Sequence, residues 1–445
     1  MNQHLLRRIA AAALFALLLP ALILLGNTYL TQLDTFAYAT VADMGERSDI
    51  EMAIVGSSVA QFHFNPEIIT EATGLNTFCA TITNLRLPGA IALTEQLFET
   101  NSPEWVVLVV EAYTFDMTME DPQTQMKLAP LLKSPLRRAR YYWDTATQDG
   151  QYIDRLLLMN GFGFSSMDDV MKSVRLRSDW RAALAAAETE LDGTMRYIDG
   201  YVRLEEPMIG RALADGMERF ETGYYYDLFD YSRQRLLDFR ALCEAHGAKL
   251  LVAVSPTLSA NTLFDPCYLP YVESACRFLR ENEIPCINML YAKPELMPNL
   301  DDMYVDPHHL HGDGADIMSA AFAKAFNMLT AGEDISPLFH YNSWHYLQAI
   351  DYITNVWAHA EAVQGGWQLT ADCNRGATVI PEYRYALLLA DGSEETLRDY
   401  SGDPVFTVPQ AALDRGSVRV YARCAGDISS AVFTDTTVLP PEESD

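Results

Sequence analysis

The sequence predicts an α/β protein with a parallel sheet, followed by a smaller antiparallel β-sandwich. Short, continuously apolar strands at 51–56 and 105–110 alternate with helical segments. Strands of this kind are typical of parallel sheets whose two faces are covered by helices. Beyond about residue 345, short segments alternate apolar and polar residues instead, which is typical of an antiparallel sandwich.

The length and the charge of the chain restrict its domain count and its partners. A chain of 445 residues is too long for one ordinary core, so two or three domains are expected. We place an α/β domain at 48–335 and the sandwich at 355–437. The net charge of −28 argues against nucleic acid as a partner and favours a solvated acidic surface.

Residues 1–33 form a distinct segment that predicts a membrane anchor or a signal segment. Arg7 and Arg8 precede an apolar run over 9–26, which is about long enough to span a bilayer and orients the N-terminus inside. A cleaved signal peptide stays open as the alternative, because Ala37-Tyr38-Ala39 resembles a cleavage site. Either way we expect the bulk of the chain outside the cytoplasm, as a single-pass membrane protein or as a secreted one.

The first part of the α/β domain reads as strand, loop, helix and strand. After the strand over 51–56, a short helix over 66–72 ends at Gly74, since glycine favours the left-handed conformation at a helix end. A second helix over 90–100 leads into the strand over 105–110.

Residues 117–225 interrupt this alternation of strands and helices and predict a helical insertion. Helices are expected over 126–142 and 180–191, and no strand is evident. The insertion could be a lid over a site or a surface for a partner.

After the insertion, helices and strands alternate again, and the predicted sandwich follows them. The α/β elements are a helix over 231–246 that ends at Gly247, a strand over 249–254, a helix over 271–283, a strand over 286–290 and a helix over 315–329. The sandwich strands are 367–373, 383–390, 405–408 and 417–424, with turns at Asp391-Gly392 and Arg415-Gly416.

Seven cysteines are present, and none has the Cys-x-x-Cys spacing of a zinc or redox motif. Cys373 and Cys424 both lie on predicted sandwich strands and are the pair expected to form a disulfide in an extracellular setting. At least one of the seven stays unpaired, and buried free thiols are the alternative for the rest.

Gly56-Ser57-Ser58 follows the first predicted strand and is the first candidate for chemistry. Open α/β sheets bind their ligands at the carboxyl ends of the strands. Gly56 allows a tight turn there, and the next helix can direct its amide groups at a developing oxyanion. A purely structural turn is the alternative for this motif taken alone.

Asp306 and His309 are the second candidate, because residues three apart in a tight turn share a face. The aspartate can hold one imidazole nitrogen while the other faces a serine. A hydroxyl, an imidazole and a carboxylate are the parts of a nucleophilic acyl-transfer site. His308 and His311 flank this pair and could indicate a metal site, but no compact set of further ligands accompanies them, so we expect neither metal nor cofactor.

Taken together, these motifs give the chain a family resemblance. Gly56-Ser57-Ser58, Phe62 and Pro66, with Asp306-x-x-His309-Leu310 and Gly314-Ala315, resemble the first and last blocks of SGNH-hydrolase-like proteins. The resemblance is closest to the membrane-anchored branch of DltD-like and AlgJ/AlgX-like O-acylation proteins. It covers about residues 50–120 and 230–330.

The resemblance implies a flavodoxin-like three-layer α/β/α fold and roles for three residues. Ser58 matches the nucleophile, His309 the general base and Asp306 its orienting acid, while Ser57 stands where many such hydrolases have aspartate. The middle blocks depart from the family. Cys79 stands where asparagine is expected, and Glu111 follows the next strand without the Gly-x-Asn motif. The oxyanion candidates are therefore the Ser58 amide, Thr81 and Asn84.

These observations predict an extracytoplasmic, membrane-anchored serine O-acyltransferase or esterase that acts on a cell-envelope glycan or polymer. A membrane O-acyltransferase is the expected partner that donates the acyl group. The alternative is an inactive cell-surface scaffold, or a module that binds carbohydrate or protein. In that case Trp367, Tyr383 and Tyr385 could line a sugar platform, although alternating core aromatics explain the same pattern.

Overall fold

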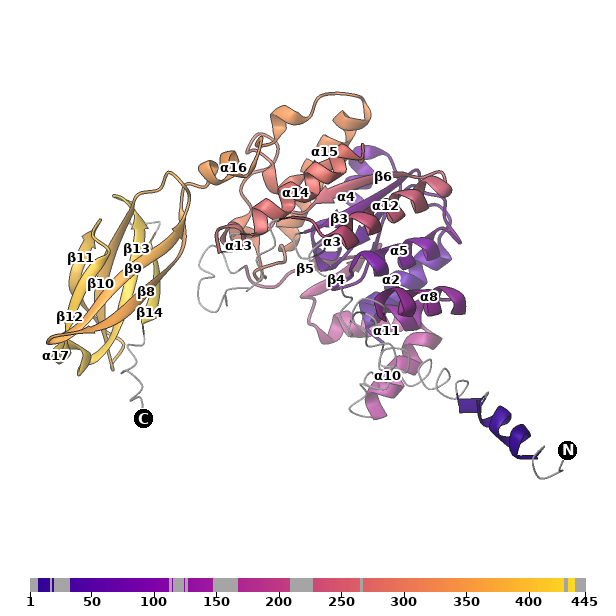
Figure 1. Cartoon of the computed structure of the whole chain (residues 1–445), viewed down its shortest axis with the longest axis horizontal. Helices are drawn as coiled ribbons and strands as arrows, with labels where there is room; N and C mark the ends of the chain where they lie inside the picture. The colour runs from indigo at the N-terminus through magenta and orange to yellow at the C-terminus, as the bar shows by residue number, and fades with distance from the viewer. Residues whose placement is uncertain are drawn as a thin grey trace.

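The computed structural model shows an α/β region and a separate group of C-terminal strands (Figure 1). It describes residues 7–16, 18–19, 33–111, 114, 124, 127–146, 167–208, 227–264, 267–427 and 431–436.

A five-stranded parallel sheet forms the centre of the α/β region. Its strands lie in the order β2-β1-β3-β6-β7, and all four neighbouring pairs are parallel. If only the five strands of this sheet are numbered in chain order, their order is the flavodoxin-like 2-1-3-4-5, which confirms the predicted fold class. The strands are β1 (Met52–Gly56), β2 (Thr77–Thr81), β3 (Trp105–Val110), β6 (Lys249–Val254) and β7 (Cys286–Asn288).

Alternate side chains of each strand point into two apolar clusters, one on each face of the sheet. In β1, Ala53 and Val55 belong to one cluster, and Met52 and Ile54 belong to the other. The helices that cover the first face include α5 (Leu87–Leu97), α12 (Asp230–Ala245) and α14 (Tyr268–Glu281). The other face is covered by α3 (Ser58–His63), α4 (Pro66–Thr73) and α15 (Gly312–Thr330). The region is therefore a three-layer α/β/α sandwich.

Most of the predicted α/β elements are present, but the helices α2 (Thr35–Glu46), α3 and α13 (Ser259–Phe264) and the strand β2 had no prediction. Gly74 ends α4 in the left-handed conformation with φ 74°, as expected. The strand β2 was missed although all five of its residues are buried, because a short apolar run has no periodicity that separates it from a loop. The six-residue helix α3 was also missed.

The described part of the insertion contains helices and a β-hairpin. The helices are α8 (Pro135–Ala146), α10 (Met167–Ser178) and α11 (Trp180–Glu190). The helix expected over 126–142 instead begins at Pro135, after the short 3₁₀ turn Ala129–Leu131, since proline favours the first turn of a helix.

The expectation that the insertion has no strand was wrong. Strands β4 (Met195–Ile198) and β5 (Tyr201–Leu204) pair antiparallel around Asp199-Gly200. Both turn residues have positive φ, 47° and 85°, as a tight hairpin turn requires. The Asp-Gly pair between two short alternating segments was the signal that the sequence offered.

The C-terminal strands form two antiparallel sheets around a core of their own, as predicted. One sheet has the order β11-β10-β13-β14 and the other β12-β9-β8. The strands are β8 (Ile353–Val363), β9 (Gly366–Arg375), β10 (Pro381–Leu389), β11 (Glu394–Ser401), β12 (Val405–Pro409), β13 (Gly416–Cys424) and β14 (Val432–Thr436). Of these, β8, β11 and β14 were not predicted.

Two aromatic side chains proposed for a sugar platform lie inside the core of these strands. Tyr383 and Tyr385 are 4% and 0% exposed. The alternative interpretation as alternating core aromatics is therefore confirmed for both tyrosines.

The predicted disulfide between Cys373 and Cys424 is not formed, and none of the seven cysteines belongs to a disulfide. Cys373 and Cys424 lie on strands of different sheets, β9 and β13. Each thiol has another neighbour: Cys373 Sγ lies 3.4 Å from the Tyr383 hydroxyl, and Cys424 Sγ lies 3.6 Å from the Asp351 carbonyl oxygen.

No helix among the described residues is long and apolar enough to cross a membrane. Much of the predicted anchor, including residues 20–26, lies outside the described residues.

Candidate functional site

The candidate site lies where β1 ends, at the carboxyl edge of the parallel sheet. Gly56 is the last residue of β1, and α3 begins two residues later at Ser58. A Cβ atom on Gly56 would lie 2.7 Å from the Ala60 Cβ and 2.9 Å from the Val109 carbonyl oxygen. Glycine is therefore required for α3 to fold back against β3, which places the two serines at the sheet edge.

The two serines differ in their surroundings. Ser57 is 4% exposed, and its buried hydroxyl has no hydrogen-bond partner among the residues described. Its carbonyl oxygen accepts bonds from the amides of Ala60 and Gln61, which starts α3. Ser58 is only half-buried, so of the two hydroxyls it is the one open to a substrate.

Asp306 and His309 are in direct contact, as their spacing predicted. Asp306 Oδ2 lies 2.7 Å from His309 Nδ1, while Asp306 Oδ1 accepts bonds from the amides of His308 and His309 at 2.7 and 2.9 Å. Burial acts to raise the pKa of Asp306, but the bonds from His309 and the two amides outweigh it and lower the pKa to about 2. The carboxylate therefore stays ionised and can orient the imidazole.

The imidazole of His309 contacts α3, the helix that begins with Ser58. His309 Nε2 is buried, and no described group bonds to it. The imidazole lies edge-on to Phe62, with the ring centroids 4.7 Å apart. Phe62 follows Ser58 by one helical turn, so both side chains lie on the same face of α3. Ser58 and His309 are not hydrogen-bonded to each other here, as is common for catalytic pairs without a substrate.

His63, which sequence reasoning missed, holds the histidine loop against α3. Its Nδ1 lies 2.7 Å from the Ser255 hydroxyl at the end of β6. Its Nε2 lies 3.0 Å from the His308 carbonyl oxygen and 3.2 Å from the Leu310 amide nitrogen. Burial, with a smaller contribution from His309, lowers the pKa of His63 to about 3, so the ring is neutral. No sequence spacing could reveal this contact, because it spans 245 residues.

The oxyanion candidates Thr81 and Asn84 lie on β2 and in the loop after it. The Thr81 hydroxyl donates to the Gly200 carbonyl oxygen at 3.0 Å, so it is engaged by the hairpin. Asn84 is exposed, and its backbone has a positive φ of 60°. Neither side chain is hydrogen-bonded to Ser58 or His309 in the described part of the chain.

Glu111 introduces a carboxyl group at the same edge. It follows the last residue of β3, the strand that pairs with β1 in parallel register. Burial raises the pKa of Glu111, and the nearby Arg86 and His309 partly oppose this shift. The sequence marked this residue only as a departure from the family; the structure shows a half-buried carboxyl within electrostatic reach of His309.

The β4–β5 hairpin forms a wall beside the site. Val202 and Leu204 of β5 pack against Phe62 and against Val305, next to Asp306. Arg203 fastens the hairpin to the start of α15 through bonds of 2.6 Å each to Asp313 and Asp316, and a third bond joins it to Glu205. The insertion therefore contributes directly to the surroundings of His309.

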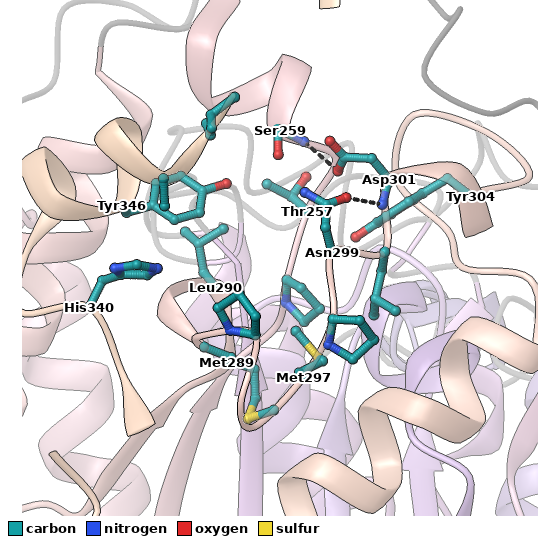
Figure 2. Close-up of a pocket in the computed structure, with 17 residues that line it drawn as sticks. Thr257, Ser259, Met289, Leu290, Met297, Asn299, Asp301, Tyr304, His340 and Tyr346 are labelled. Carbon is teal, nitrogen blue, oxygen red and sulfur yellow. Dashed lines mark hydrogen bonds between the residues drawn. The ribbon is translucent and has the colours of Figure 1, made fainter. Parts of the chain in front are cut away.

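A cavity of about 110 Å³ lies at the carboxyl ends of β6 and β7 (Figure 2). Tyr304 lines it and also closes the histidine loop through a bridge to Leu310. On its wall, the Ser259 amide donates to Asp301 Oδ1 at 3.0 Å. Ser58, Asp306 and His309 are not among the residues that line this cavity, so it adjoins the histidine loop without containing the candidate triad.

The described residues hold no group of three or more histidine, cysteine, aspartate or glutamate side chains that could bind a metal ion. The histidines near residue 309 have other contacts. His308 and His309 follow the Asp306 turn, and His311 accepts a bond from the Asp313 amide through Nδ1.

No family model matches the chain, and no curated protein matches its sequence. Among solved structures, the chain is similar to a protein from Bacteroides fragilis that is assigned as an acylhydrolase (9% identity, TM-score 0.30, 65% of this chain and 94% of that chain). It is also similar to a protein from Desulfitobacterium hafniense assigned to the G-D-S-L family of lipolytic proteins (8% identity, TM-score 0.28, 62% and 98%). A third similar structure is a GDSL-like lipase from Bacteroides thetaiotaomicron (10% identity, TM-score 0.29, 66% and 100%).

Proposed function

We propose that the chain is a serine esterase or O-acyltransferase that is anchored to a membrane and acts outside the cytoplasm. The observation that carries this proposal is the Asp306–His309 pair, whose imidazole contacts Phe62 on α3, the helix that begins with Ser58, and whose Nε2 bonds to no described group. A carboxylate, an imidazole and an accessible hydroxyl in this order are sufficient for acyl transfer through a covalent intermediate.

In the first step, Ser58 Oγ attacks the carbonyl carbon of an acyl ester, and its proton passes to His309 Nε2. Asp306 stabilises the imidazolium that forms. When the tetrahedral intermediate collapses, His309 returns the proton to the leaving alcohol and an acyl-Ser58 ester remains. Water or a glycan hydroxyl then attacks this ester with His309 again as base, which completes hydrolysis or transfer.

The oxyanion of the intermediate needs hydrogen-bond donors at the sheet edge. We assign the Ser58 amide and the Glu111 carboxyl to this role, because the Thr81 hydroxyl is engaged by Gly200. A carboxyl whose pKa is raised by burial can stay protonated and donate a hydrogen bond. Glu111 would thus replace the asparagine that the family resemblance leads one to expect.

The resemblance and the predicted anchor favour a cell-envelope glycan or polymer as the acyl acceptor. A membrane O-acyltransferase would supply the acyl group, because an anchored site lies close to a donor in the same membrane. An inactive scaffold is the second candidate, and two departures from the family pattern favour it: Cys79 stands where asparagine is expected, and no Gly-x-Asn motif follows β3.

The two serines allow a matched test with the full chain in detergent. We expect the purified protein to hydrolyse p-nitrophenyl acetate, and Ser58→Ala and His309→Ala to abolish the activity. Ser57→Ala is the control, since the Ser57 hydroxyl is buried and has no described partner. Equal activity in Ser58→Ala and the wild type would exclude this mechanism, and no activity with any activated ester would favour the scaffold.

A further inference from the structure

Two cysteines lie next to each other at one end of the parallel sheet. Cys276 is on α14, Cys286 is the first residue of the edge strand β7, and α14 packs against β7. Both residues are partly exposed, whereas Cys79 and Cys243 are fully buried. The structure holds both as thiols, and we call them the α14–β7 thiol pair.

The contacts around the pair direct the two sulfur atoms toward each other. The Asn288 side-chain amide donates to Cys276 Sγ at 3.6 Å. Asn288 and Cys286 are two residues apart on β7, so their side chains point to the same face of the sheet, on which α14 lies. Both cysteines pack against the same apolar cluster, and the Cys286 thiol donates a hydrogen bond to Cys276 Sγ. The two thiols are therefore in direct contact.

The chain between the two cysteines is a short turn. Cys286 follows Cys276 by ten positions. Helix α14 ends at Glu281, and the Ile284 amide then donates to the Leu279 carbonyl oxygen at 2.9 Å, across Glu283 in the left-handed conformation with φ 55°. This turn leads straight into β7, so the local fold alone sets the position of one cysteine against the other.

The two thiols differ in how readily they ionise. The hydrogen bond from Cys286 lowers the pKa of the Cys276 thiol, and a smaller contribution from Asn288 acts in the same direction, against the effect of burial. The same hydrogen bond, together with burial, raises the pKa of the Cys286 thiol. The thiolate is the nucleophile of disulfide exchange, so Cys276 is expected to react first.

We propose that the α14–β7 thiol pair is a site of reversible oxidation, which forms a Cys276–Cys286 disulfide by exchange with a small-molecule disulfide such as oxidised glutathione. The Cys276 thiolate attacks one sulfur of the oxidant, so that a mixed disulfide forms and one thiol is released. Cys286 then loses its proton and attacks Cys276 Sγ, and the second thiol leaves. Two electrons pass to the oxidant, and the two cysteine protons end on the two released thiols.

The disulfide would join two elements that hold residues of the cavity wall (Figure 2). Strand β7 leads directly into the 3₁₀ turn Met289–Tyr291, whose first two residues line the cavity. On α14, Glu273 accepts a bond of 2.6 Å from the amide of Ser343, the first residue of α16 (Ser343–Ala349). Tyr346 of α16 lines the same cavity. The pair includes none of the residues assigned to catalysis, so the proposal is independent of the proposed activity.

Peptide mass spectrometry of the full chain tests the pairing. Protein purified under reducing conditions would be freed of reductant, treated with oxidised glutathione, and digested with trypsin without reduction. Trypsin releases Cys276 in peptide 250–277 and Cys286 in peptide 281–324. We expect the two peptides to be joined in the oxidised wild type and separated by dithiothreitol. Because Cys267 is also in peptide 250–277, Cys267→Ala is the matched control: it should retain the link, and Cys276→Ala should lose it.

Two further measurements use the same samples. In Cys286→Ala, oxidised glutathione should leave a mixed disulfide on Cys276, and it should form faster than a mixed disulfide on Cys286 in Cys276→Ala. Oxidation should raise the Tm of the α/β region by about 5 °C in the wild type and leave it unchanged in either variant.

The proposal would be overturned if the two peptides stayed separate in oxidised wild-type protein whose circular dichroism shows that it is folded. A link that persists in Cys276→Ala would also overturn it, because the partner of Cys286 would then be another cysteine. Equal rates of mixed-disulfide formation in the two variants would contradict the assignment of Cys276 as the first nucleophile.

Discussion

At the scale of single residues, the sequence predicted the parts of the site that are close together in the chain. Asp306 and His309 are joined by one turn, so their contact followed from spacing alone. Ser58 followed from its place after an apolar strand. His63 and Glu111 could not be predicted as site residues, because their positions beside His309 depend on packing between distant segments.

Glu111 allows a pH-dependent test of the oxyanion assignment. Burial raises the pKa of Glu111, so the protonated donor persists to higher pH than for an ordinary carboxyl and is lost as the pH rises through that pKa. As the pH rises through the pKa of Glu111, we expect kcat to fall in the wild type. In Glu111→Gln it should stay level over the same range, because the amide donates a hydrogen bond at any pH. Glu111→Ala should lose about 10²- to 10³-fold in kcat.

Identical pH profiles of kcat in the wild type and Glu111→Gln would contradict this role. Asp302→Asn replaces an exposed carboxylate before the histidine loop and is a control for nonspecific charge effects.

His63 should make folding stability depend on pH. Its pKa is about 3 in the folded state and close to 6.5 when unfolded. Between these values the unfolded chain binds the proton and the folded chain does not, so stability is lost as the pH falls from about 6.5 to 3. The slope is at most about 1.4 kcal/mol per pH unit.

The variant His63→Gln should have a shallower fall of Tm over this pH range, measured by calorimetry. At pH 7 it should itself be less stable by about 1–3 kcal/mol, because it weakens the bonds to Ser255 and the histidine loop. An unchanged slope in His63→Gln would show that other groups cause the acid sensitivity.

At the scale of elements, the β4–β5 hairpin is the largest difference between expectation and structure. Its strands have four residues each, too few for a clear alternation, and the segment was interpreted from its helical neighbours. The hairpin docks through backbone contacts, such as the Cys79 amide to the Asp199 carbonyl oxygen at 2.9 Å, which no side-chain pattern reveals.

Gly200 and Gly193 form a matched pair for testing the hairpin. Both have positive φ, but a Cβ on Gly200 would lie 1.8 Å from the Cys79 carbonyl oxygen, whereas one on Gly193 would meet nothing within 4 Å. Gly193→Ala should reduce the free energy of unfolding by about 1–2 kcal/mol, because alanine is disfavoured in the left-handed conformation. Gly200→Ala should cost more and also lower kcat/KM for esters, because the hairpin must move away from Phe62.

Tm and kcat/KM of the two variants check this prediction. If Gly200→Ala lowered Tm no more than Gly193→Ala and left kcat/KM unchanged, the hairpin would not support the site.

At the scale of the whole molecule, the sequence predicted both architectures because each has its own hydrophobic period. Buried parallel strands are continuously apolar, and the C-terminal strands alternate. It could not predict β11, because this strand is mostly polar and exposed at a sheet edge. Nor could it predict how the two regions meet, which involves single contacts such as Asn299 Nδ2 to the Tyr352 hydroxyl at 3.3 Å.

The separate cores predict two unfolding transitions in calorimetry. Val252 of β6 and Val420 of β13 are both fully buried, each in a different apolar cluster. Val252→Ala should lower the Tm only of the transition that accompanies loss of ester hydrolysis, and Val420→Ala only that of the other transition. Each substitution should reduce the free energy of unfolding of its own region by about 2 kcal/mol. One transition that both variants lower equally would show that the regions unfold together.

The central claim is that Ser58 is an activated nucleophile, and covalent labelling tests it most directly. The full chain would be treated with a fluorophosphonate probe, and the adduct would be located by peptide mass spectrometry. The account predicts an adduct on Ser58 that is absent from His309→Ala and retained in Ser57→Ala. A folded protein that carries no adduct on Ser58, or one that His309→Ala still labels at the wild-type rate, would contradict it.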